Sequence, residues 1–167
     1  MKSSPTILQA SKRDVLPCLE ILLDSYLGEE YFSREVAGPI LKEACKKNEL
    51  FVAKDKTGEV LGFYSLVLDG TFLVFGYLHL IAVRTESRGI GIGTKLLNDA
   101  EKRIVRNPGY PFSKKVFLLC GKKNRKAKSY YEKNGYIRVG TIPSLFSSGV
   151  DEYLMMNDLG KIARSLS

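Results

Sequence analysis

The most apolar part of the chain is the run YLHLIAV at residues 77–83, in which apolar and polar positions alternate only weakly. A run of this kind is typical of a strand that is buried on both faces of a sheet. Residues 95–104 have a different period, because Leu96, Leu97, Ala100 and Ile104 recur at the spacing of one helix face. The pattern therefore predicts a central strand, a connection at residues 84–94 and an amphipathic helix.

Before this point, the pattern predicts an edge strand at residues 5–8 and two helices. Ser11 and Asp14 resemble a capping box that opens the first helix, whose apolar positions are Val15, Leu19, Leu22 and Tyr26, and Gly28 is expected to end it. Ser33 is expected to cap a second helix over residues 34–47, with its inward side chains at Val36, Ile40, Leu41 and Ala44. A hairpin follows, with strands at residues 50–53 and 59–68 joined by a turn at 55–58.

A second turn is expected at Asp69–Gly70, before the central strand. After the central helix we expect a loop at residues 107–111, a buried strand at 115–120 and a helix from Asn124 to Asn134 that Gly135 ends. Two strands, at residues 136–139 and 152–156, complete the sheet, with a loop at 142–150 between them. The order β-α-α-β-β-β-α-β-α-β-β predicts an α/β fold with a mixed sheet of six to seven strands.

The connection between the central strand and helix carries three alternating glycines, Gly89, Gly91 and Gly93. A strand, a glycine loop and a helix N-terminus together favour phosphate binding, because unpaired backbone N–H groups and the helix dipole both attract an anion. The spacing does not fit a dinucleotide loop, since the third glycine of G-x-G-x-x-G would fall at Thr94. It does not fit a P-loop either, because Lys95 is followed by leucine.

Composition and charge limit the class of protein. The 167 residues suit a single domain over residues 1–167, and no run of 18 apolar residues or basic-then-apolar leader appears, so we expect a cytoplasmic protein without a membrane span. The three cysteines are far apart and the single histidine has no cysteine pair, which predicts free thiols and no metal site. Residues 61–167 carry 17 basic and 8 acidic side chains, a field that favours a polyanionic cofactor or a nucleic acid, unless it is simply a solvated surface.

Two motifs resemble those of one enzyme family. Arg88, Gly91 and Gly93 form R-x-x-G-x-G, which is similar to the pyrophosphate loop of the GCN5-related N-acetyltransferases (GNAT). The stretch from Asn124 to Tyr136 resembles the N-x-x-A-x-x-x-Y-E-K-x-G-F helix of the same family. The resemblance implies the acyl-CoA N-acyltransferase fold, a splayed sheet with acetyl-CoA between its fourth and fifth strands.

The resemblance also implies which residues contact acetyl-CoA. Backbone groups of the central strand would pair with the pantetheine arm, the glycine loop would hold the pyrophosphate, and Asn124 would cap its helix and reach the pantetheine arm. The implied cofactor-binding residues are Ile81, Ala82, Val83, Arg88, Gly89, Ile90, Gly91, Ile92, Gly93, Thr94 and Asn124.

Acetyl transfer to an amine needs a base for the ammonium and an acid for the departing thiolate. Tyr131 occupies the acid position of the family, and a phenol held near the sulfur can donate its proton. His79 is the candidate base, because an imidazole titrates near neutral pH and alternation places it on the face of Tyr77 and Ile81. Either side chain could instead be a core residue, and this stays open from sequence.

The predicted function is N-acetylation of a primary amine by acetyl-CoA, with no metal. Leu119 stands where related enzymes that modify protein N-termini carry glutamate, which favours a small-molecule amine over a protein N-terminus or lysine. A non-catalytic CoA-binding module and, more weakly, a basic nucleic-acid-binding protein are the alternatives, and the chain is expected to be a monomer or homodimer.

Overall fold

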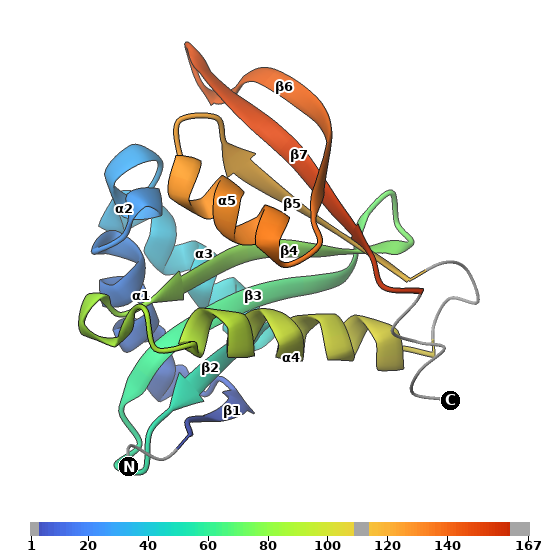
Figure 1. Ribbon diagram of the computed structural model, residues 1–167. Helices are drawn as coiled ribbons and strands as arrows, with labels where there is room; N and C mark the ends of the chain where they lie inside the picture. Colours follow the sequence, from blue (N-terminus) through green and yellow to red (C-terminus); the bar gives the residue numbers. More distant parts are fainter. Residues whose placement is uncertain (1–3, 109–113, 161–167) are drawn as a thin grey trace. The chain divides into compact units, whose positions relative to one another are not determined.

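The computed structural model describes residues 4–108 and 114–160 of the chain (Figure 1). Its strands form one mixed seven-stranded sheet in the order β1-β2-β3-β4-β5-β7-β6, which confirms the predicted α/β class. The strands are β1 (Thr6–Gln9), β2 (Leu50–Lys54), β3 (Val60–Thr71), β4 (Phe75–Val83), β5 (Lys115–Gly121), β6 (Ile137–Ser147) and β7 (Val150–Asp158). The helices are α1 (Val15–Leu23), α2 (Tyr26–Glu30), α3 (Arg34–Lys46), α4 (Ile92–Arg106) and α5 (Arg125–Lys133), with short 3-10 turns at Lys12–Asp14 and Thr85–Ser87.

The chain separates into two compact units. The first comprises Met1–Leu66 and Leu80–Ala100, and the second comprises Val67–His79 and Glu101–Ser167. The prediction of a single domain over the whole chain stays a prediction. No helix within residues 4–108 and 114–160 has the length and apolar character needed to cross a membrane.

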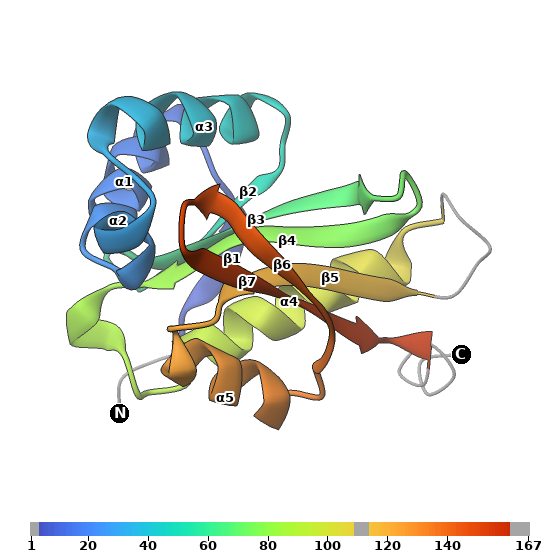
Figure 2. The ribbon, with the colours of Figure 1, turned by 90° about the horizontal axis from the view of Figure 1, so that it is seen from above.

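The core of the first unit lies between helices α1 and α3 and the strands beside them (Figure 2). Leu22, Leu41, Leu50 and Phe63 are fully buried there, and each comes from a different element. Burial of one such side chain is worth about 1.5–3 kcal/mol, so these contacts supply much of the stability of the unit.

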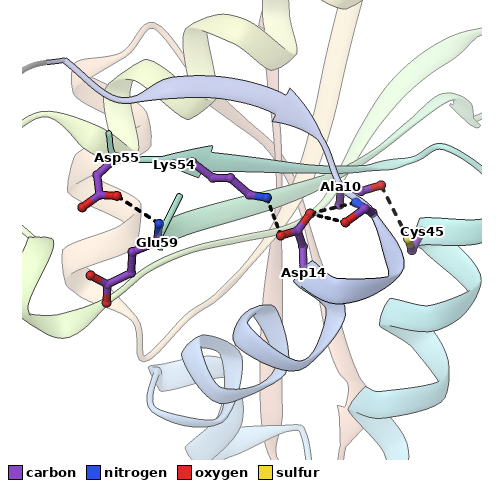
Figure 3. Close-up of polar contacts among 7 residues, drawn as sticks. Ala10, Asp14, Cys45, Lys54, Asp55 and Glu59 are labelled. Atoms are coloured by element: carbon purple, nitrogen blue, oxygen red, sulfur yellow. Dashed lines mark hydrogen bonds and ion pairs between the residues drawn. The ribbon is translucent and has the colours of Figure 1, made fainter. Parts of the chain in front are cut away.

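The start of α1 is tied to β2 by a buried carboxylate (Figure 3). Asp14 Oδ2 accepts hydrogen bonds from the backbone N–H and the hydroxyl of Ser11, at 2.8 and 2.9 Å, as the predicted capping box requires. Lys54 Nζ lies 2.6 Å from Asp14 Oδ1. Burial works to raise the pKa of Asp14, but the hydrogen bonds from Lys54 and Ser11 outweigh it, so the pKa is lowered overall.

The second unit contains the strands β5, β7 and β6, with α5 beside them (Figure 1). A buried polar cluster joins its elements. Tyr136 Oη donates to Glu101 Oε1 at 3.0 Å, and Asn157 Nδ2 donates to the same oxygen at 3.2 Å. Burial raises the pKa of Glu101, although both hydrogen bonds oppose the shift.

Two predictions about the first two helices need correction. Helix α1 ends at Leu23, where Ser25 Oγ donates to the carbonyl of Leu22 at 2.6 Å. Gly28 does not end that helix. It lies inside α2, where a Cβ atom would come within 2.4 Å of the carbonyl oxygen of Leu23, so the glycine is needed for close approach. Val36 is 50% exposed rather than inward, because the buried stripe of α3 contains Ala37, Gly38, Leu41 and Ala44.

The predicted turn at Asp69–Gly70 is also wrong, because β3 continues to Thr71. The chain turns instead at Phe72 and Leu73, whose φ angles of +53° and +61° are unusual for non-glycine residues. Phe72 is 72% exposed, and its ring packs edge-on against Phe117 with 5.9 Å between centroids.

Residues 142–147 belong to β6 and are not the predicted loop. The connection to β7 is a tight turn at Ser148–Gly149, where Gly149 has a φ of +76°. Pro143 is compatible with this strand because β6 is an edge strand, where a missing N–H costs no ladder hydrogen bond. The predicted loop at residues 107–111 lies partly outside the described residues.

Candidate active site

The glycine loop lies in the first unit, between β4 and α4. Gly89 and Gly91 have φ angles of +78° and +87°, a left-handed conformation that only glycine adopts at little cost. The carbonyl of Gly91 accepts the backbone N–H of Lys95 at 3.0 Å, so Gly91 immediately precedes the first turn of α4. The backbone N–H groups of Ile92, Gly93 and Thr94 therefore have no partner inside the helix.

The surface around these glycines is open. A Cβ atom at Gly89 or Gly91 would meet no described atom within 4 Å, and Ile90 between them is 63% exposed. An open surface that presents first-turn amides of a 15-residue helix is suited to an anion. These residues therefore fit the pyrophosphate of acetyl-CoA by the chemistry of their donors.

Arg88 shapes the loop through its side chain. Its Nε donates to the carbonyl of Val83 at 3.0 Å, and its Nη2 donates to the carbonyl of Asp24 at 3.2 Å. Thr85 Oγ1 also donates to Asp24 Oδ2, at 2.6 Å. The guanidinium thus joins the end of β4 to the residue that follows α1, and sequence reasoning did not detect this positioning role.

The strand before the loop is less buried than the sequence suggested. Leu78, Leu80 and Ala82 are buried, whereas Ile81 and Val83 are half-buried. The prediction of a strand buried on both faces is therefore wrong, because the alternate positions of β4 remain partly accessible. Ala82 belongs to the core of the first unit, so only its backbone is suited to ligand contact.

His79 lies on β4 in the second unit and is exposed. Its ring stacks on that of Tyr77, with 5.6 Å between centroids and 25° between planes, which confirms that these two side chains share a face. Although His79 is exposed, the protein atoms around its ring partly desolvate it and lower its pKa, so the imidazole is neutral at pH 7. A neutral imidazole that remains accessible can accept a proton.

Tyr131 lies on α5 in the same unit and is only 8% exposed. Its ring packs against Tyr130 and Tyr136, with centroids 5.3 and 5.5 Å away. Burial raises its pKa far above the usual value for tyrosine, so the phenol keeps its proton at every practical pH. Asn124 Oδ1 accepts the backbone N–H of Ala127 at 3.1 Å and caps this helix, as predicted.

The candidate acid and base lie on opposite faces of the sheet. Tyr77 pairs with Phe117, so Tyr77, its stacking partner His79 and Phe117 point to one side. Phe117 pairs with Met156, so Asn157 points to the other side, where it contacts Glu101. Tyr136 binds the same carboxylate and packs against Tyr131, which places Tyr131 on that second face.

Glu152 is a further candidate that sequence reasoning missed. It lies on β7, is 2% exposed and pairs with Gly121 of β5. Burial, followed by the charge of Glu152, raises the pKa of Tyr77 to about 12. Glu152 follows Asp151 directly in the sequence, so no sequence signal distinguished it.

Basic side chains surround a shallow hollow at the start of α5. It is lined by Lys122, Lys123, Arg125, Gly149 and Asp151, and Lys122 Nζ lies 3.2 Å from Asp151 Oδ2. Within residues 4–108 and 114–160, Lys122 is the one cation of this hollow that forms an ion pair, so the hollow is electropositive. In the same part of the chain, no group of three His, Cys, Asp or Glu side chains is placed to hold a metal ion.

Residues 46–138 match the family model described as an acetyltransferase (GNAT) domain, which is more than half of the chain. The chain belongs to the GNAT acetyltransferase family. Its members are acyl-CoA-dependent acyltransferases that use acetyl-CoA, so the predicted family, enzyme class and cosubstrate are confirmed at this level.

Solved structures agree with this assignment. A protein from Pyrococcus horikoshii is similar at 25% identity, with a TM-score of 0.73 over 92% of this chain and 98% of that one. A NatC complex bound to a Gag peptide and CoA is similar at 20% identity, with a TM-score of 0.73 over 94% and 99%. A spermidine N-acetyltransferase chimera from Vibrio cholerae and hSSAT is similar at 21% identity, with a TM-score of 0.71 over 95% and 98%.

Proposed function

We propose that this acetyltransferase moves the acetyl group of acetyl-CoA to a primary amine on a small molecule. The observation that carries the proposal is the loop at Gly89–Thr94, where two left-handed glycines open the surface at the first turn of α4. The similar structures include a spermidine acetyltransferase and a peptide-bound complex, so they do not select the acceptor. Leu119, in place of a glutamate, favours the small molecule.

In this proposal the backbone carries the cosubstrate. The amides of residues 89–94 bind the pyrophosphate, and Arg88 holds the loop in the required shape. The backbone of residues 81–83 pairs with the pantetheine arm like an added strand, and Asn124 donates to it from its amide nitrogen while its oxygen caps α5. A main-chain N–H of β4 stabilises the oxyanion that forms at the thioester carbonyl.

The chemical step needs two proton transfers. His79, directly or through water, takes a proton from the ammonium, and the neutral amine attacks the thioester carbon. The C–N bond forms, the C–S bond breaks, and the nitrogen loses its second proton to solvent as the amide forms. Tyr131 protonates the departing CoA thiolate and then recovers a proton from solvent, so one proton is released per amide.

The test is a screen of thiol release from acetyl-CoA in the presence of amines, polyamines, amino acids and peptides. We expect release with at least one small primary amine, and acetylated product of matching mass. Release with peptides alone would move the acceptor to a protein, and no release above hydrolysis with any amine would contradict the proposed function.

A further inference from the structure

The two left-handed glycines give the glycine loop a conformational freedom that another part of the chain must restrict. Gly89 and Gly91 have positive φ angles, and a Cβ at either position would meet no described atom within 4 Å. Glycine loses more conformational freedom on folding than any other residue. The amides of residues 89–94 therefore need an anchor outside the two glycines, on a segment that is itself held in place.

The connection between β4 and α4 is anchored at two places. At its start, Arg84 Nε donates to the carbonyl of Val60 at 3.1 Å, which fixes the connection to β3. Closer to the glycines, Thr85 Oγ1 and Arg88 Nη2 donate to two different atoms of Asp24. Asp24 is therefore the acceptor on which both side chains next to the glycine loop converge.

Asp24 is a suitable anchor because the helix before it is firmly held. Its backbone N–H donates to the carbonyl of Glu20 at 3.1 Å, so it continues the hydrogen bonding of α1. Leu22 of this helix is fully buried in the core of the first unit, and the other end of the helix is tied to β2 through Asp14 and Lys54 (Figure 3). The anchor and the glycine loop both belong to the first unit.

The two contacts use different groups of Asp24. Its carbonyl accepts from Arg88 at 3.2 Å, whereas its carboxylate oxygen Oδ2 accepts the Thr85 hydroxyl at 2.6 Å. A hydrogen bond from a hydroxyl to a carboxylate is short and about twice as strong as one between neutral groups. The Thr85 contact can be removed by changing side chains alone, while the contact of Arg88 with the backbone stays.

We propose that Asp24 is a positioning residue for acetyl-CoA binding, which acts through Thr85 to hold the glycine loop in its binding conformation. This inference rests on the proposed function, because it assumes that the loop binds the pyrophosphate, and it adds a residue that lies outside both family motifs. A loop that is already in its bound conformation loses less conformational entropy on binding. Loss of the contact should therefore weaken acetyl-CoA binding and leave the chemical step unchanged.

The chain offers a matched control in the same unit. Thr57 Oγ1 also donates to a carboxylate oxygen, Asp55 Oδ1, at 2.7 Å, but these two residues belong to one turn and join no distant elements. Valine has the branched shape of threonine without its hydroxyl. Thr85→Val and Thr57→Val therefore remove the same kind of hydrogen bond, and Thr85→Ser keeps the hydroxyl.

The first experiment measures the dissociation constant of acetyl-CoA by isothermal titration, with thermal unfolding to check that each variant is folded. We expect Thr85→Val to bind about 3- to 10-fold more weakly, the range of one net hydrogen bond, while Thr85→Ser and Thr57→Val bind like the wild type. In thiol release, Thr85→Val should raise the KM for acetyl-CoA and keep kcat. Undiminished binding by Thr85→Val, an equal loss in Thr57→Val or a loss confined to kcat would overturn the proposal.

A double-mutant cycle separates the Asp24 contact from any other effect of valine at position 85. Asp24→Ala removes the carboxylate but keeps the carbonyl that accepts from Arg88. In that background Thr85→Val should have no further effect on acetyl-CoA binding, because the partner of the hydroxyl is already absent. The same 3- to 10-fold loss in both backgrounds would overturn the role of Asp24 while leaving the proposed function intact. Failure of the wild type to bind acetyl-CoA would overturn both.

Discussion

The glycine loop allows a controlled test of cosubstrate binding, because the chain contains two glycines of the same geometry. Gly91 in the loop and Gly58 in the β2–β3 turn both have a φ of +87°, and a Cβ at either would meet no described atom within 4 Å. Alanine at either position costs about 1–2 kcal/mol for the left-handed conformation. For a chain of this size, that cost lowers the melting temperature by roughly 2–8 °C.

The two variants should differ only in acetyl-CoA binding. Gly91→Ala pushes the loop towards another φ, so its amides no longer converge, and the loss of one hydrogen bond to a charged group weakens binding about 10- to 100-fold. The turn at residues 55–59 lines the same hollow as the loop but supplies none of the amides of residues 89–94, so the dissociation constant of Gly58→Ala should stay close to that of the wild type.

Isothermal titration with acetyl-CoA and thermal unfolding of both variants provide the measurement. Undiminished binding by Gly91→Ala, with both variants equally destabilised, would refute the loop as the pyrophosphate site. Equal weakening in both variants would show that the effect comes from loss of folded protein.

Three further predictions concern the candidate acid Tyr131, the candidate base His79 and the buried carboxylate of Asp14. Tyr131→Phe should lower kcat up to about 100-fold with unchanged acetyl-CoA affinity, and the loss should be equal across the assay range because the raised pKa keeps the phenol protonated; an unaltered kcat would make Tyr131 a packing residue. The wild-type rate should rise with pH through an apparent pKa below the usual histidine value, and His79→Gln should remove that limb; a retained limb would assign the base elsewhere. Asp14→Asn should lower the free energy of unfolding by about 1–3 kcal/mol at pH 7 in urea titrations. Because the folded pKa of Asp14 is lowered, this difference should vanish as the pH falls below about 4, and a pH-independent difference would contradict the ion pair with Lys54.

Local patterns predicted most elements of the fold because their causes are local. The capping box at Ser11 and Asp14, the cap at Asn124 and the left-handed Gly135 at the end of α5 all act within a few residues. The errors arose where a tertiary contact decided the outcome. Gly28 serves close packing against the end of α1, and the turn after β3 lies at Phe72, whose ring contacts Phe117 of another strand.

The same contrast between local patterns and tertiary contacts applies to the candidate site. The glycine loop is continuous in sequence, so its spacing and its helix could be recognised before any coordinates. The side-chain clamp of Arg88 was not predicted, because its acceptor at Asp24 lies 64 residues away in another element. A motif identifies the segment whose backbone forms the loop, but the contacts that hold the loop conformation come from distant parts of the fold.

The cosubstrate is easier to predict from this sequence than the acceptor. A pyrophosphate is bound by backbone amides, and glycine spacing records their arrangement in the sequence. The candidate base is a side chain, and whether side chains of different strands lie on one face, as Tyr77 and Phe117 do, depends on how the strands are paired. A one-residue shift of β5 against β4 would turn Phe117 away from the face of Tyr77, and no local pattern distinguishes the two registers. Side chains that contact an acceptor are therefore harder to predict from sequence than a backbone loop that holds the cosubstrate, because their arrangement is set by strand register rather than by local spacing.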